Sequence, residues 1–104
     1  MLTQKRLKEL MSYDPSTGEF TRRVTVNYNA KVGDVAGSLS AQTGYVRISV
    51  DGTLYPAHRL AWLYVYGRFP FSELDHKNHV RDDNRIANLR EVTQLENRQN
   101  KSLS

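Results

Sequence analysis

Side chains able to bind a cation and to move a proton gather between residues 73 and 100 of this chain, in the segment ELDHKNHVRDDNRIANLREVTQLENRQN. Asp75 and His76 are adjacent there, and Asn88 and Asn97 follow. Carboxylate and carboxamide oxygens bind hard divalent cations, and a neutral imidazole takes a proton from water. We therefore predict that this segment holds a catalytic site and that the upstream chain supports it.

The residue types also limit which metal the segment would bind. Cysteine is absent, so any metal must be held through oxygen or imidazole. One carboxylate and one carboxamide oxygen, with open positions for water and substrate, fit Mg²⁺. Zinc held by His76 and His79 is the less favoured alternative, because only Asp75 and the distant His58 could complete that site.

Four expected elements would position these side chains. The pattern predicts a strand over residues 73–76, a polar loop over 77–88, a strand over 89–93 and a helix from about Gln94. Thr93 is suited to cap that helix, and Glu96 lies where it would complete a capping box. The expected order is strand, loop, strand, helix.

In that arrangement the two strands pair antiparallel and the helix packs across them. Asp75 and His76 then point to opposite faces, so one can bind metal while the other addresses a water. Asn97 and Asn100 lie one helical turn apart, and either could bring an oxygen toward Asp75. Asn88, at the end of the loop, is placed to tie the loop backbone to His76.

The upstream chain predicts a small antiparallel sheet flanked by helices. Thr3 can cap a helix over residues 4–11, and the Asp51-Gly52 pair indicates a hairpin turn. Helical spacing around Trp62, ended by Gly67, predicts a buried helix over residues 57–66 in which His58 is more often a neutral structural histidine than a ligand. The expected strands lie at residues 19–26, 35–39, 45–50 and 53–55, with loops or turns at 14–18, 27–34 and 41–44.

Length and charge restrict the class of protein and of partner. The 104 residues suffice for one domain, and the mean hydropathy of -0.64 and the lack of a bilayer-length apolar run argue against a membrane partner. The charged first residues resemble no secretion signal, so we expect a cytoplasmic location. A net charge of +4 favours a polyanion as partner. The basic residues that we expect on nucleic acid are Arg47, Lys77, Arg81, Arg85, Arg90 and Arg98.

Four stretches of the C-terminal half resemble the HNH endonuclease family, which has a ββα-metal fold, and especially its small phage and mobile-element homing-type members. They are AHRLAW at 57–62, LDHKN at 74–78, DNRIANLR at 83–90 and EN at 96–97. The upstream stretches YDP, GEF and GDVAG resemble the leader of these small proteins less specifically. The resemblance covers nearly half the chain.

The resemblance implies a role for each matching residue. Asp75 and Asn97 become metal ligands, which selects Asn97 over Asn100; His76 becomes the general base; and Asn88 orients the loop and the histidine. It further implies one divalent metal ion, Mg²⁺ or otherwise Mn²⁺ or a similar ion, and double-stranded DNA as the substrate. The alternative function is a catalytically weak or inactive DNA-binding module of the same fold.

Two neighbouring residues of the loop depart from the family pattern. Members usually have Gly and then Asp after the position of Asn78, whereas this chain has His79 and Val80. If the backbone there has a positive φ, His79 bears a strain of about 1 kcal/mol; otherwise the loop takes another path.

We therefore expect an α+β fold in a single domain spanning residues 1–104. Residues 1–56 would form a small N-terminal antiparallel sheet with a helix, serving as support and DNA contact. Residues 57–104 would add a helix and the ββα-metal (HNH) motif. One active centre per chain is compatible with a monomer or a homodimer, with nicking or, through two centres or two events, double-strand cutting.

Overall fold

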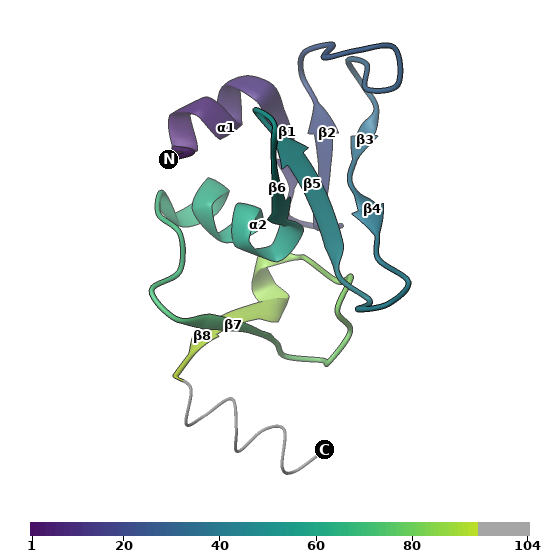
Figure 1. The fold of residues 1–104 in the computed structure, drawn as a ribbon. Helices are drawn as coiled ribbons and strands as arrows, with labels where there is room; N and C mark the ends of the chain where they lie inside the picture. Colours follow the sequence, from purple (N-terminus) through teal and green to yellow (C-terminus); the bar gives the residue numbers. More distant parts are fainter. Residues whose placement is uncertain (94–104) are drawn as a thin grey trace.

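The computed structural model describes residues 1–93, which form a mixed α/β structure with antiparallel sheets (Figure 1). The helix expected from Gln94, with Asn97 and Arg98, lies outside the described residues. Neither α-helix of residues 1–93 is long and apolar enough to cross a membrane. The elements in chain order are α1 (Gln4–Leu10), β1 (Met11–Asp14), β2 (Glu19–Arg22), β3 (Val35–Ala36), β4 (Ser38–Leu39), β5 (Val46–Val50), β6 (Thr53–Pro56), α2 (Ala57–Tyr66), β7 (Glu73–His76), the 3₁₀ turn η1 (Ile86–Asn88) and β8 (Leu89–Val92).

The first sheet has the strand order β1-β2-β3 and follows α1 directly. Thr3 caps α1 as expected, since its hydroxyl accepts a hydrogen bond from the Arg6 backbone N–H at 3.2 Å. Strand β1 was not expected: the helix stops one residue early, and Met11 and Tyr13 turn inward in alternation with exposed neighbours. The expected strand over 19–26 is also shorter, because β2 ends at Arg22.

The second sheet has the order β4-β5-β6, and its hairpin turns at Asp51-Gly52 as expected. The single strand predicted over residues 35–39 is divided between the two sheets. Ala36 pairs with Phe20 of β2, whereas Ser38 pairs with Arg47 of β5. The backbone changes direction at Gly37, whose φ of 113° is open to glycine but strained for other residues.

Helix α2 joins the two sheets through the core. Its residues Leu60, Ala61 and Leu63 are almost fully buried and belong to the same cluster as Phe20 of the first sheet and Ile48 of the second. Burial of each leucine, isoleucine or phenylalanine side chain of this cluster contributes about 1.5–3 kcal/mol. The helix has the bounds that the sequence predicts, and it ends at Gly67 in the left-handed conformation.

The β7–β8 hairpin lies at the end of the molecule where the described chain finishes (Figure 1). Strand β7 has the predicted bounds and β8 ends at Val92, one residue early. Asp75 is paired across the hairpin with Arg90, and His76 with Leu89. The expected strand, loop, strand order is therefore confirmed, while its closing helix lies beyond the described residues.

Candidate active site

Strand β7 places Asp75 and His76 on opposite faces of the hairpin, as strand geometry requires. The His76 side chain is directed into the protein and His76 is only 4% exposed. The Asp75 carboxylate instead meets its cross-strand partner, with Arg90 Nε 3.3 Å from Asp75 Oδ2. The two groups thus occupy different environments: the imidazole is enclosed by the protein, and the carboxylate is paired with a cation.

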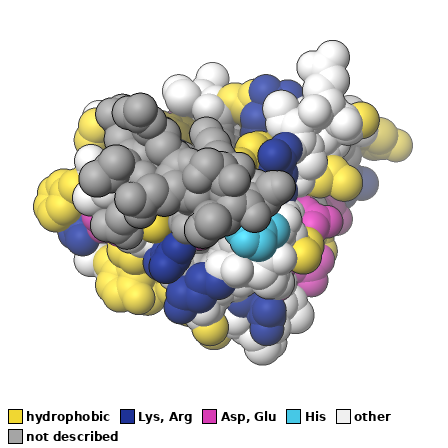
Figure 2. Space-filling view, turned by 90° about the horizontal axis from the view of Figure 1, so that it is seen from below, with side chains coloured by type: hydrophobic (Ala, Val, Ile, Leu, Met, Phe, Trp, Pro, Cys, Tyr) yellow, Lys and Arg dark blue, Asp and Glu magenta, His cyan; other side chains and the backbone are white. Residues whose placement is uncertain are grey.

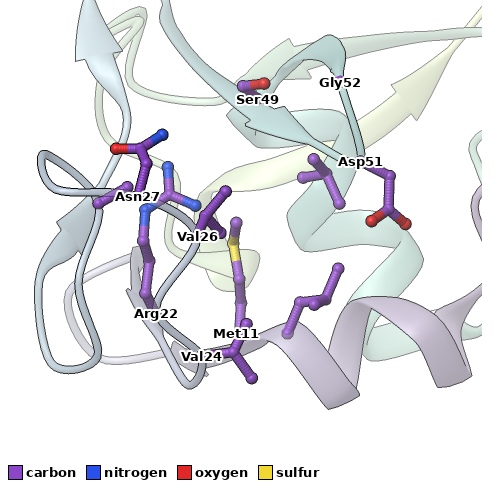
Figure 3. Close-up of a pocket in the computed structure, with 11 residues that line it drawn as sticks. Met11, Arg22, Val24, Val26, Asn27, Ser49, Asp51 and Gly52 are labelled. Atoms are coloured by element: carbon purple, nitrogen blue, oxygen red, sulfur yellow. The ribbon is translucent and has the colours of Figure 1, made fainter.

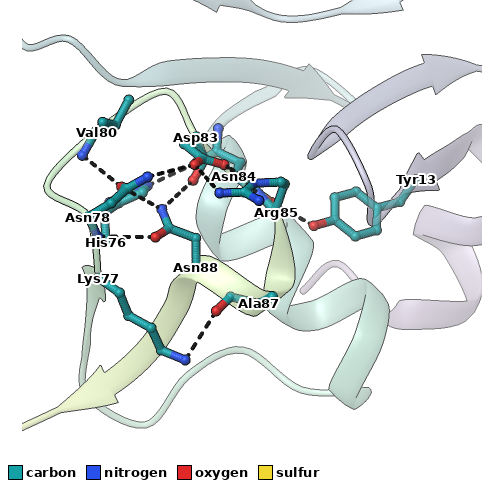
Figure 4. A network of polar contacts seen from close by, with 10 residues as sticks. All are labelled: Tyr13, His76, Lys77, Asn78, Val80, Asp83, Asn84, Arg85, Ala87 and Asn88. Atoms are coloured by element: carbon teal, nitrogen blue, oxygen red, sulfur yellow. Dashed lines mark hydrogen bonds and ion pairs between the residues drawn. The ribbon is translucent and has the colours of Figure 1, made fainter.

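The His76 ring is held from two sides by residues distant in sequence. Its Nε2 lies 2.9 Å from Asn84 Oδ1, a buried hydrogen bond (Figure 4). His58 of α2 packs edge-on against it, with the ring centroids 4.9 Å apart, and Tyr45 lies 5.9 Å away. The imidazole is therefore fixed in orientation.

His58 is the second imidazole of this cluster. Burial, followed by the nearby His76 and Arg59, lowers the pKa of His58 to about 4, so it is neutral at neutral pH. Its Nδ1 is buried and finds no hydrogen-bond partner among residues 1–93. The structure agrees with the neutral structural histidine that the sequence favours.

Asn88 connects several parts of the loop over residues 77–88 (Figure 4). Its Oδ1 accepts a hydrogen bond from the Asn78 backbone N–H at 3.1 Å, and its Nδ2 donates to Asn78 Oδ1 and to the Asp83 carbonyl oxygen, each at 2.9 Å. Its backbone carbonyl also accepts from Lys77 at 2.8 Å. Asn88 thus holds the loop, but the side chain bonded to the His76 ring is that of Asn84.

The sequence does not identify Asn84 as a site residue. Taken alone it is a loop cap, although it lies in the DNRIANLR stretch that carries the family resemblance. Which of two asparagines faces the imidazole depends on the loop path, which spacing cannot give. Both asparagines are buried, and the structure resolves the question through the hydrogen bond that joins Asn84 to the His76 ring.

Asp83 closes the same loop through charge. Arg85 Nε and Nη2 donate to the two Asp83 oxygens at 2.8 and 2.7 Å, and Asn78 Nδ2 donates at 2.8 Å. Arg85 first, and Asn78 after it, hold the pKa of Asp83 well below its usual range. The carboxylate therefore remains charged and keeps the loop closed.

His79 has a φ of 62°, which confirms the first of the two alternatives for the Gly-to-His departure. Its backbone N–H donates to the His76 carbonyl oxygen at 2.9 Å, so the turn forms despite the side chain. A non-glycine residue in this region costs about 1 kcal/mol, and histidine is among the more tolerant types.

The expected DNA-contacting cations differ in their partners. Arg47 is exposed on β5, and Arg98 lies outside the described residues. The other four touch the protein: Lys77 Nζ donates to the Ala87 carbonyl oxygen at 3.1 Å, Arg81 Nη1 to that of Thr43 at 2.7 Å, and Arg85 and Arg90 pair with Asp83 and Asp75. The view from below shows several Lys and Arg side chains gathered on that face (Figure 2).

A pocket of about 160 Å³ lies in another part of the molecule, between the end of α1, β2 and the β5–β6 turn (Figure 3). Its lining combines apolar groups such as Met11 and Val26 with Arg22 and Asp51. Neither Asp75 nor His76 borders it, so the pocket is separate from the candidate site.

Asp75 is the one metal ligand implied by the resemblance that lies within the described residues. Within residues 1–93, no three His, Cys, Asp or Glu side chains gather around a common point. The Asp75 side chain is 15% exposed, and its carboxylate is paired with Arg90. Carboxylate oxygens are ligands for hard divalent cations. The second ligand implied by the resemblance, Asn97, lies outside the described residues.

Comparison with known proteins agrees with this geometry. The model of a family described as HNH endonuclease matches residues 55–99, a segment that contains β7, the loop and β8. Residues 55–99 of this chain belong to the HNH endonuclease family. The chain also has 26% sequence identity to a solved structure described as "DNA binding and cleavage by the HNH homing endonuclease I-HmuI", with a TM-score of 0.64.

The structural match covers 89% of this chain and 52% of the I-HmuI chain. The chain thus spans about half the length of that protein. No curated protein matches it significantly. The family resemblance inferred from the sequence is confirmed, and the N-terminal sheets are included in the similarity as well as the HNH segment.

Proposed function

We propose that this chain is a metal-dependent DNA endonuclease that hydrolyses phosphodiester bonds. The observation that supports this best is the adjacent pair of Asp75 and His76 at the end of β7, inside the segment matched by the HNH model, with the two side chains directed to opposite faces. In this arrangement the carboxylate can hold a metal ion at a phosphate, while the imidazole takes a proton from the water that attacks the same phosphate.

Each residue of the site has a distinct role in the proposal. His76 takes the proton of the attacking water, and Asp75 with Asn97 would hold the divalent cation. Bound there, Mg²⁺ or a similar ion supplies Lewis-acid stabilisation of negative charge on the phosphate and leaving oxygen. Arg90 restrains the Asp75 carboxylate, and Asn88 maintains the loop that ends in these groups.

The proposed substrate is double-stranded DNA. The family, the DNA binding and cleavage described for I-HmuI, and the net charge of +4 support this. Residues 57–104 would form the nuclease motif, and residues 1–56 would support it and contact DNA through residues such as Arg47. One centre per chain cuts one strand, so a monomer would nick, whereas a double-strand break needs two copies or two events.

Nicking of supercoiled plasmid tests the proposal. We expect cleavage with Mg²⁺, its loss with chelator, and a decrease of about 10² or more for His76→Ala and for Asp75→Ala. His79→Ala is the matched control, because His79 is an exposed histidine of the same loop, and it should retain activity. Undiminished cleavage by His76→Ala or Asp75→Ala would contradict the assignment of these residues to the catalytic site.

The burial of His76 favours a second candidate, a DNA-binding module with little turnover. A general base must be reached by water, and His76 is 4% exposed. In this case the wild-type protein would bind DNA with the usual salt dependence but would show no cleavage that depends on metal.

A further inference from the structure

Asn84 connects the His76 ring to the N-terminal half of the chain. Its side-chain oxygen lies 2.9 Å from His76 Nε2, and its backbone carbonyl accepts a hydrogen bond from the Tyr13 hydroxyl at 2.6 Å (Figure 4). Tyr13 and Asn84 are 71 residues apart, and both are buried. Tyr13 of β1 is thus linked to the proposed general base, His76, through a single intervening residue, Asn84.

The first hydrogen bond determines where the His76 proton lies. An amide oxygen has no hydrogen to give, so Asn84 Oδ1 can only accept, and His76 Nε2 must be the donor. A neutral imidazole has one N–H, which leaves Nδ1 as the nitrogen with the free electron pair. Asn84 therefore assigns the proton-accepting role to Nδ1.

The second hydrogen bond restrains Asn84 itself. The Tyr13 ring packs on Phe20 and Tyr64, with centroids 4.8 and 5.6 Å away. Burial raises the pKa of Tyr13 to about 12, so the phenol stays protonated and continues to donate over the working pH range. These ring contacts restrain the Tyr13 hydroxyl, and its hydrogen bond in turn restrains the Asn84 backbone.

The β1–β2 turn restrains the same peptide by close packing. A Cβ built on Gly18 would lie 2.4 Å from the Asn84 carbonyl carbon and 2.5 Å from the Arg85 nitrogen. Only a residue without a side chain allows the turn to approach so closely. The N-terminal hairpin thus contacts Asn84 through a hydrogen bond and through backbone contact.

We propose that Asn84 is a positioning residue for His76, which keeps the proton on Nε2 and Nδ1 free to accept, and that Tyr13 of the N-terminal hairpin anchors it. The catalytic consequence rests on the proposed endonuclease function. The structural part, the protonated nitrogen, does not.

Nitrogen-15 NMR of the imidazole rings tests the structural part in the full chain without metal. At about pH 8.5, where an ordinary histidine is neutral, we expect wild-type His76 to be protonated at Nε2. Asn84→Ala, which removes the acceptor, should give a mixture of the two tautomers. Asn84→Asp retains an oxygen acceptor and should keep the proton on Nε2, and the exposed Asn29→Ala is the matched control.

Plasmid nicking by the same variants tests the catalytic part. We expect Asn84→Ala to lower kcat by about tenfold or more with little change in KM, because DNA contacts are untouched. Asn84→Asp should recover part of this loss. Tyr13→Phe should lower kcat in the same direction, whereas the exposed Tyr28→Phe should not.

The outcomes separate this inference from the proposed function. A wild-type His76 protonated at Nδ1 overturns the inference, even where Asn84→Ala fails to fold, and so does a folded Asn84→Ala with an unchanged tautomer and kcat. A wild-type protein with the Nε2 proton but without nicking activity would contradict the endonuclease proposal and leave the tautomer assignment confirmed.

Discussion

The fold lowers the pKa of His58 from an ordinary value of 6.5 to about 4, chiefly because the ring is buried. The unfolded chain, with an ordinary histidine pKa near 6.5, binds this proton more readily than the folded protein. Stability should therefore be constant with respect to His58 above about pH 6.5, fall between 6.5 and 4, and not fall further on its account below 4. The expected loss is on the order of 3 kcal/mol.

Urea unfolding at several pH values measures this loss. In His58→Phe, whose ring can still pack against Tyr45 and His76, the slope between pH 6.5 and 4 should be much smaller. Asp83 does not interfere, because its pKa is held low and its contribution is lost only at more acidic pH. Equal slopes for both proteins would show that His58 is not the group responsible.

His79 is the residue where backbone strain and sequence conflict most directly, with φ at 62°. Since glycine adopts this conformation freely, His79→Gly should stabilise the protein by up to about 1 kcal/mol, measured by urea unfolding. Val80→Gly, its exposed neighbour without a positive φ, is the control and should destabilise by about 0.5–1 kcal/mol. If His79→Gly loses as much stability as Val80→Gly, the interpretation that the His79 backbone is strained is wrong.

At the scale of the elements, the turn between β1 and β2 matters because it packs against the loop over residues 77–88. Gly18 and Gly52 have nearly equal φ angles, 79° and 81°, but a Cβ on Gly18 meets backbone at 2.4 Å and one on Gly52 meets nothing within 4 Å. Both alanine variants incur the conformational cost of about 1 kcal/mol. Gly18→Ala should lose a further 1–3 kcal/mol from overpacking.

Thermal unfolding of the two variants measures the difference in their stability. Nicking assays show whether the substitution at Gly18 also affects the candidate site. We expect Gly18→Ala to lose activity at a temperature where it remains folded, because the displaced peptide is that of Asn84, while Gly52→Ala keeps its activity. Equal stability of the two variants would show that the β1–β2 turn is not closely packed against the backbone of Asn84 and Arg85.

The elements also show what sequence patterns can predict here. Helix α2 and strand β7 are predicted with their bounds, because helical spacing around Trp62 and an apolar-polar strand before a turn are local signals. Strand β1 is missed, since its four residues follow α1 without a turn and are defined by pairing with β2. Asn84 is missed for the same reason, because its partner is set by tertiary contacts.

At the scale of the whole molecule, the net charge of +4 predicts binding to DNA that weakens with salt. The logarithm of the binding constant should fall linearly with the logarithm of salt concentration, with a slope of about -0.9 per phosphate contact. Arg47→Gln should make this slope less steep by about 0.9 if the exposed face of β5 touches DNA.

Arg6→Gln is the matched control for that measurement. Arg6 already pairs with Asp51 and Glu9, at 2.9 and 3.4 Å, so its loss should change the slope little. Fluorescence anisotropy with a labelled duplex at several salt concentrations gives both slopes. An equal change in the two variants would show that overall charge, and not the β5 surface, sets the affinity.

The hydrogen bond from Tyr13 to the Asn84 carbonyl also limits how this protein can be recombined with others. A chimera that joins the HNH segment to a foreign N-terminal half would leave that carbonyl buried without its donor, at a cost of about 1–3 kcal/mol. A replacement of the N-terminal half is therefore compatible with the HNH segment only when the incoming hairpin brings a phenol and a glycine in register with Tyr13 and Gly18. The N-terminal hairpin and the HNH segment are in this sense inherited together.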